Sequence, residues 1–135
     1  IIYVHRNPYA VISSMLNSKF YSFASNIEQA VIKYKKNISG IMGHLKKDTI
    51  HIIRYEDLHS DSVKTIEKLL KFCNLESSKR IIQKIINENN KTSKVKVKGV
   101  FRIGKINSYI LELSNNELEY INKELKDYIN IDFFL

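Results

Sequence analysis

Two apolar runs along the chain have the pattern of buried β-strands. Ile1 to Val4 is apolar without interruption, as expected for a parallel strand covered on both faces. Thr49 to Arg54 alternates into a second apolar strand. Parallel strands need a long crossover, which is usually helical. The spacing therefore predicts an α/β layer fold, with a parallel sheet and flanking helices.

Apolar residues that recur every three or four positions predict amphipathic helices in most of the remaining chain. Ser25 and Glu28 have capping-box spacing, and we expect the helix after them to run from Ile27 to Leu45. Asp61 to Cys73 predicts another helix, and the last one opens at Ser114. The expected order is strand, helix, helix, strand, helix, helix, basic loop, helix.

The residues after the first strand have the chemistry to hold an anion. Arg6 places a cation where the strand leaves the sheet, and Asn7 with Pro8 has the pattern of a helix start. Ser14 lies seven residues beyond Asn7, which is about two helical turns and therefore the same face. A guanidinium, a helix start and a hydroxyl on that face suit an anionic ligand. The alternative is a capped surface helix with Arg6 facing water.

Tyr55 follows the second strand within the segment HIIRYEDL. An aromatic face at a strand end can stack on a nucleotide base, although a half-buried ring with its hydroxyl in water is the alternative. We expect Glu56 and Asp57 to open a loop. Adjacent residues at a strand end point to opposite sides, so these carboxylates favour capping or ion pairing over paired catalysis.

Charge and cysteine content limit the function classes further. The 135 residues suit one domain, and 22 basic against 14 acidic residues give a net charge of +8, which favours anionic ligands.

We expect Cys73, the single cysteine, to be a buried structural thiol. A single cysteine cannot form an internal disulfide, so a cytoplasmic location is expected. The four histidines lack metal-ligand spacing. No apolar run approaches the ~20 residues that span a bilayer.

A basic segment runs from Lys94 to Lys105 and includes Lys98 and Arg102. Its alternation of Lys and Val is compatible with an edge strand protected by charge. The functional alternative is a mobile lid whose cations close over phosphates, with Gly99 and Gly104 as hinges.

Taken together, these motifs resemble the sulfotransferases that use 3′-phosphoadenosine 5′-phosphosulfate (PAPS). Arg6-Asn7-Pro8, with Ser14 eight residues past the arginine, resembles the family's 3′-phosphate-binding segment. Tyr55-Glu56-Asp57-Leu58 resembles the motif whose tyrosine lies against the adenine. Lys71 to Leu75 is similar to the KFLGL-type ending that follows this motif, and the segment from Arg102 to Asn107, which contains Gly104, is a weaker match to a Gly-x-Trp-Lys element.

The resemblance implies in-line transfer of a sulfuryl group from PAPS to an acceptor hydroxyl or amine, without a metal. Arg6 and Ser14 would hold the 3′-phosphate, Tyr55 the adenine, and Lys98 or Arg102 the phosphates. The acceptor substrate is unidentified, and neither a nucleic-acid partner nor a membrane segment in these residues is expected. Two alternatives stay open: a fragment of another P-loop nucleotide enzyme such as a kinase, and a basic nucleic-acid-binding module.

Departures from the family pattern indicate a divergent bacterial or carbohydrate-directed member. Ile106 stands where the family has Trp, and Gly99, Val100 and Phe101 stand where many members have Arg-Lys-Gly. A Gly-rich phosphate loop before a helix does not appear in the sequence. We therefore expect residues 1–135 to be the C-terminal half of a P-loop-NTPase-like sulfotransferase fold, carrying no catalytic base and inactive alone.

Overall fold

The computed structural model describes residues 1–18, 23–44, 49–92 and 106–129. The chain divides into two compact units. The first combines Ile1–His5 with Asp48–Phe101, and the second combines Arg6–Lys47 with Arg102–Leu135. Each unit is therefore built from segments that are far apart in the sequence.

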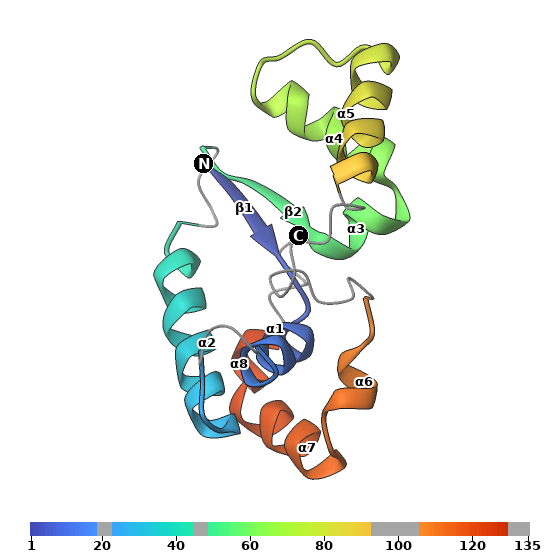
Figure 1. Cartoon of the computed structure of the whole chain (residues 1–135). Helices are drawn as coiled ribbons and strands as arrows, with labels where there is room; N and C mark the ends of the chain where they lie inside the picture. The colour runs from blue at the N-terminus through green and yellow to red at the C-terminus, as the bar shows by residue number, and fades with distance from the viewer. Residues whose placement is uncertain (19–22, 45–48, 93–105, 130–135) are drawn as a thin grey trace. The chain divides into compact units, whose positions relative to one another are not determined.

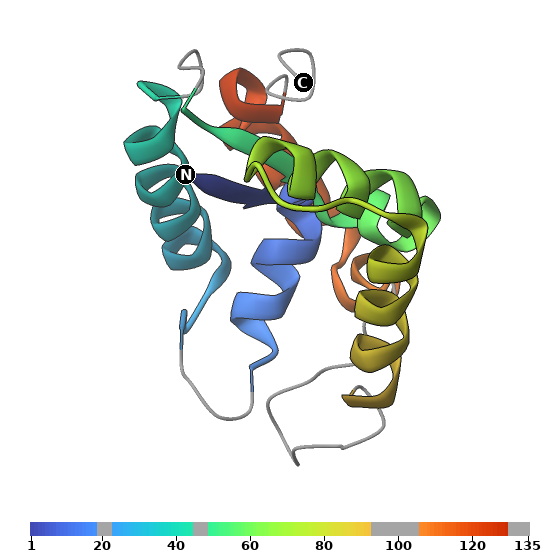
Figure 2. The same cartoon turned by 90° about the horizontal axis from the view of Figure 1, so that it is seen from above.

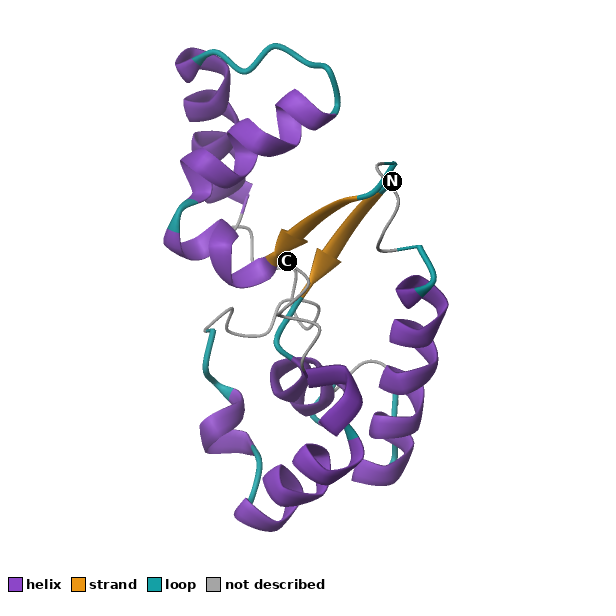
Figure 3. Cartoon of the chain, turned by 180° about the vertical axis from the view of Figure 1, so that it is seen from behind, coloured by secondary structure: helices purple, strands orange, loops and turns teal. Residues whose placement is uncertain are grey.

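The first unit contains a parallel pair of strands, β1 (Ile2–His5) and β2 (His51–Arg54). Ile2 is the partner of His51 and His5 the partner of Arg54 in the register, and Figure 3 shows both arrows running in the same direction. The predicted parallel pairing is confirmed. The first strand begins and ends one residue later than expected, so its last residue is His5. The side chain of His5 is buried.

The described residues of the first unit also form the helices α3 (Tyr55–Ser60), α4 (Ser62–Phe72) and α5 (Lys79–Thr92). Helix α3 begins directly after β2, so the prediction of a loop at Glu56 and Asp57 is wrong, because both residues lie in its first turn. The side chain of Asp61 accepts a hydrogen bond from the Lys64 amide at 3.2 Å and caps α4. Figure 1 shows α4 and α5 as neighbours.

Helix α4 ends in a left-handed turn. Asn74 has a φ of 58°, and its amide donates to the Lys71 carbonyl while the Leu75 amide donates to the Leu70 carbonyl. This is a Schellman ending, which needs glycine or asparagine at its left-handed position. Asn74 thus stands where the KFLGL-type ending has its glycine. Cys73 is exposed, so the prediction of a buried thiol is wrong.

Where the second unit is described, its secondary structure is helical and comprises α1 (Pro8–Leu16), α2 (Ile27–Met42), α6 (Tyr109–Glu112), α7 (Asn115–Glu124) and α8 (Lys126–Ile129). Helix α1 packs against α2, as Figure 2 shows, and α2 also contacts α7. The apolar core joins residues from all three of these helices and the turns beside them. It includes Ile12, Val31, Ile38, Ile121 and Leu125.

Hydrogen bonds at the helix starts explain two of the helix boundaries. Asn26 rather than Ser25 caps α2, because the Asn26 side chain accepts from the Gln29 amide at 3.0 Å; the capping box predicted at Ser25 and Glu28 is therefore wrong. The predicted capping box at Ser114 is confirmed. Helix α2 ends at Met42 rather than continuing to residue 45.

Candidate functional site

The start of α1 is built by the residues that immediately follow β1. The Oδ1 atom of Asn7 accepts a hydrogen bond from the Tyr9 amide at 2.9 Å, and Pro8 is the first helical residue. Proline suits this position because an N–H group at the first helical residue has no partner within the helix, so a residue that lacks the N–H loses no hydrogen bond there. The predicted cap is therefore confirmed. Arg6, in the link between strand and helix, is half-buried.

Two adjacent serines of α1 have different surroundings. Ser13 is 1% exposed, and its hydroxyl donates to a carboxylate oxygen of Glu112 in α6. Ser14, which was predicted to bind the ligand, is half-buried. It lies on the same face of α1 as the capping residue Asn7. Since the Ser13 hydroxyl already has a buried acceptor, Ser14 is the serine that suits a ligand.

A second contact between α1 and α6 joins two aromatic rings. Tyr9 stacks on Tyr109 with ring centroids 5.4 Å apart and an interplanar angle of 19°. The Tyr9 hydroxyl donates to the side-chain carbonyl of Asn122 in α7. Burial, together with the neighbouring Tyr109, raises the pKa of the Tyr9 phenol above its ordinary value.

Sequence reasoning missed these contacts between α1 and the C-terminal helices. Ser13 and Glu112 are 99 residues apart in the chain. Nothing in the local pattern around Ser13 marks it as a buried polar residue, because serine is compatible with either face of a helix. Tyr109 follows the basic segment in the sequence, but no local pattern there identifies Tyr9 as its partner.

Tyr55 is the first residue of α3, at the carboxyl end of β2. Its ring is half-buried and lies 4.8 Å from the ring of His59, with an angle of 59° between their planes. The two residues are four apart on one helix, which places them on the same face. His59 was not predicted as a neighbour of Tyr55, because this segment was interpreted as a loop, where the i, i+4 spacing has no meaning.

Each motif begins directly after the last residue of a strand. His5 and Arg54 are partners in the parallel pair, and Arg6 and Tyr55 are the residues that follow them in the chain. Both motifs thus begin where a strand ends, as the sequence predicted. Lys98 and Arg102, the other predicted ligands, lie outside the described residues.

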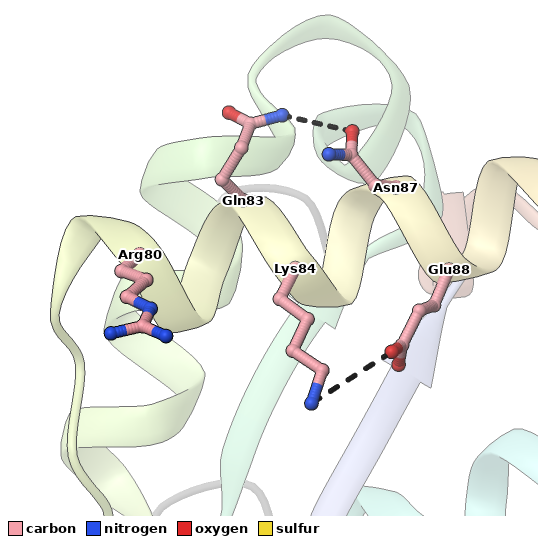
Figure 4. A pocket seen from close by; sticks show the side chains of 5 residues that line it. All are labelled: Arg80, Gln83, Lys84, Asn87 and Glu88. Atoms are coloured by element: carbon pink, nitrogen blue, oxygen red, sulfur yellow. Dashed lines mark hydrogen bonds and ion pairs between the residues drawn. The ribbon is translucent and has the colours of Figure 1, made fainter.

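A shallow hollow runs along the polar face of α5 (Figure 4). Gln83 donates to Asn87 at 3.1 Å, and Lys84 is 4.0 Å from the carboxylate of Glu88. Arg80 completes the lining, and none of the residues predicted to bind the nucleotide belongs to it. These i, i+4 pairs have the character of a solvated helix surface.

The described residues contain no group of three or more His, Cys, Asp or Glu side chains arranged to hold a metal ion. In the same part of the chain, no helix has the length and apolar character required to cross a membrane.

Phosphate-bearing ligands bind at the carboxyl ends of the strands in open α/β sheets, and both motifs of this chain start at such ends. A model of the sulfotransferase family matches residues 1–79, a range that includes Arg6, Ser14 and Tyr55. The chain belongs to the sulfotransferase family. Comparison with curated proteins and with solved structures found no match.

Proposed function

We propose that this protein transfers a sulfuryl group from PAPS to an acceptor hydroxyl or amine. The observation that carries the proposal is that one family match spans both motifs, each of which begins at the carboxyl end of a strand. In the first motif, α1 starts with a capped turn directly after Arg6. That arrangement suits an anion.

Each motif is assigned one part of the nucleotide. Arg6 pairs with the 3′-phosphate through a charge-assisted hydrogen bond, and the hydroxyl of Ser14 donates to the same group. The ring of Tyr55 stacks on the adenine, a contact that needs an aromatic face rather than a specific polar group. Lys98 or Arg102 supplies positive charge toward the phosphates.

The reaction itself asks for positioning and charge stabilisation more than for covalent chemistry, as in phosphoryl transfer. The bond between sulfur and the 5′-phosphate oxygen breaks, and a bond from the acceptor oxygen or nitrogen to sulfur forms as the acceptor loses its proton. Adenosine 3′,5′-bisphosphate leaves with the electron pair of the broken bond. Because donor and product share the 3′-phosphate, the contact of Arg6 can be measured without turnover.

Calorimetric titration with adenosine 3′,5′-bisphosphate and with adenosine 5′-phosphate tests the proposal. The product of the complete coding sequence should bind the bisphosphate more tightly, and Arg6→Ala should remove most of that preference. Loss of a charge-assisted contact costs roughly 2–3 kcal/mol, which corresponds to about 30- to 150-fold in affinity.

Arg80→Ala is the matched control, because Arg80 is an exposed arginine on α5 and its loss lowers the net charge by the same amount. This variant should keep the preference for the bisphosphate. Equal affinity of the unmodified protein for both nucleotides would contradict the proposal. Affinity for any polyanion with a steep salt dependence would instead indicate nucleic-acid binding.

A further inference from the structure

The helix that carries Ser14 is held in place by side chains that lie outside the family match. The match ends at residue 79, whereas α6 and α7 comprise Tyr109–Glu112 and Asn115–Glu124. All three helices belong to the second unit. The contacts of α1 with these two helices are therefore a feature of this chain that the family motif does not describe.

Three contacts hold one face of α1 against α6 and α7. The rings of Tyr9 and Tyr109 stack at 5.4 Å, the Tyr9 hydroxyl donates to Asn122, and the Ser13 hydroxyl donates to Glu112. Tyr9 and Ser13 are four residues apart and so share a face of the helix. Ser14 is the next residue, about 100° around the helix axis. A rotation or shift of α1 that broke these contacts would move Ser14 as well.

The pairing of Ser13 with Glu112 is the contact with the most specific chemistry. Ser13 is 1% exposed, and a buried hydroxyl that loses its partner carries a desolvation cost. The carboxylate of Glu112 thus defines one preferred position for the serine, and with it the angle of α1. Positioning of this kind matters for a ligand contact, because productive geometry tolerates displacements of only about 0.5 Å.

We propose that Glu112 is a positioning residue for the 3′-phosphate, acting through Ser13 on the placement of Ser14. The inference rests on the proposed binding of a 3′-phosphorylated nucleotide by α1. Glu112 does not touch the ligand; it supplies the acceptor that fixes the helix. Tyr109 supports the same placement through its ring.

The charge of Glu112 and its role as an acceptor for the Ser13 hydroxyl can be separated by substitution. Glu112→Gln removes the charge but keeps an oxygen acceptor for Ser13, and it should bind adenosine 3′,5′-bisphosphate at least as well as the unmodified protein. Glu112→Ala removes the acceptor too, and it should bind this nucleotide about 2- to 30-fold more weakly.

The experiment compares the calorimetric affinities of adenosine 3′,5′-bisphosphate and adenosine 5′-phosphate for the product of the complete coding sequence and its variants. Glu112→Ala should lower the first affinity and leave the second unchanged, because only the first nucleotide has the 3′-phosphate. Ser13→Ala should reproduce this loss, and the double variant Ser13→Ala/Glu112→Ala should lose no more than either single variant. Glu119→Ala, at an exposed carboxylate of α7, is the control and should change neither affinity.

Each other result has a definite meaning. The positioning role would be overturned if Glu112→Ala weakened the binding of both nucleotides equally. It would also be overturned if this variant lowered the melting temperature without changing the ratio of the two affinities. Weak binding by Glu112→Gln would also overturn it, since the acceptor is kept. An unmodified protein that binds both nucleotides equally would overturn the proposed function itself, and this inference with it.

Discussion

Tyr55 is half-buried, and a neighbouring ring limits its orientation. It is the first residue of α3, and its neighbour His59 lies against it at 4.8 Å in a tilted geometry. Such a contact limits the rotamers of the tyrosine and so reduces the entropy lost when a base stacks on it. The ring rather than the hydroxyl is expected to bind the adenine.

Substitution of Tyr55 separates these two parts of the side chain. Tyr55→Phe should leave the affinity for adenosine 3′,5′-bisphosphate nearly unchanged, whereas Tyr55→Ala should weaken it by about 1–3 kcal/mol. Calorimetric titration of the product of the complete coding sequence measures both values. A large loss in the phenylalanine variant would mean that the hydroxyl makes the decisive contact and that stacking is the wrong explanation.

At the residue scale, sequence reasoning succeeds where chemistry and position are both local. The caps at Asn7 and Ser114 were predicted because a side chain that accepts from an amide two or three residues away is a short-range feature. Cys73 was misjudged because its exposure depends on where α4 ends, and the left-handed turn at Asn74 sets that end. Ser13 and Glu112 depend on a contact that no local pattern encodes.

Helices α2 and α7 are joined by an ion pair, and we therefore expect the stability of their packing to depend on pH. The ammonium of Lys35 lies 2.7 Å from a carboxylate oxygen of Glu124, and its hydrogen bond and charge lower the pKa of that carboxyl group from its ordinary value of 4.5. A lowered folded-state pKa means that the stabilisation is fully present above the ordinary value. It is lost as the pH falls through the folded-state pKa.

Urea unfolding at a series of pH values from 6 down to about 3 should reveal this dependence. The unmodified protein should lose more stability than Glu124→Gln on acidification, since the variant has no carboxylate to protonate at this position. Both groups are partly exposed, so the difference is expected to be small and to shrink at high salt. Glu119→Gln should follow the unmodified protein. Parallel curves for Glu124→Gln and the unmodified protein would show that the pair does not couple the helices.

At the element scale, the length of a helix determines whether it can be predicted from the sequence. Helix α2 has 16 residues, enough for its apolar face to repeat. Helices α3 and α6 have six and four residues, which is too short for a 3.6-residue period to be recognised. The strand pairing could be predicted because a helical crossover between two apolar runs favours a parallel arrangement. The predicted edge strand or lid at Lys94–Lys105 lies outside the described residues.

The two units differ in how much of their structure is buried. Helices α1 and α2 each have four buried residues among those described, and Ile121 and Leu125 add to the same core. Helices α3 and α4 have none, and Ile53 and Ile82 are the main buried apolar residues of the first unit in the described ranges. Burial of apolar surface is the dominant stabilising term in folding, so the second unit should resist local opening more strongly.

Hydrogen exchange followed by mass spectrometry tests this difference directly. Backbone amides in the middle of α1, α2 and α7 should exchange more slowly than those of α4, after correction for intrinsic rates, because opening α4 exposes little apolar surface. Helices α2 and α4 form the closest comparison, because both are longer than ten residues and have caps at their first turns. Ile12→Ala, which opens a cavity at a fully buried position, should accelerate exchange in α1 and α2, whereas Ile32→Ala at a 64% exposed position should not. Equal protection of α2 and α4 would show that the two units open as one, and that the uneven distribution of buried residues does not control their stability.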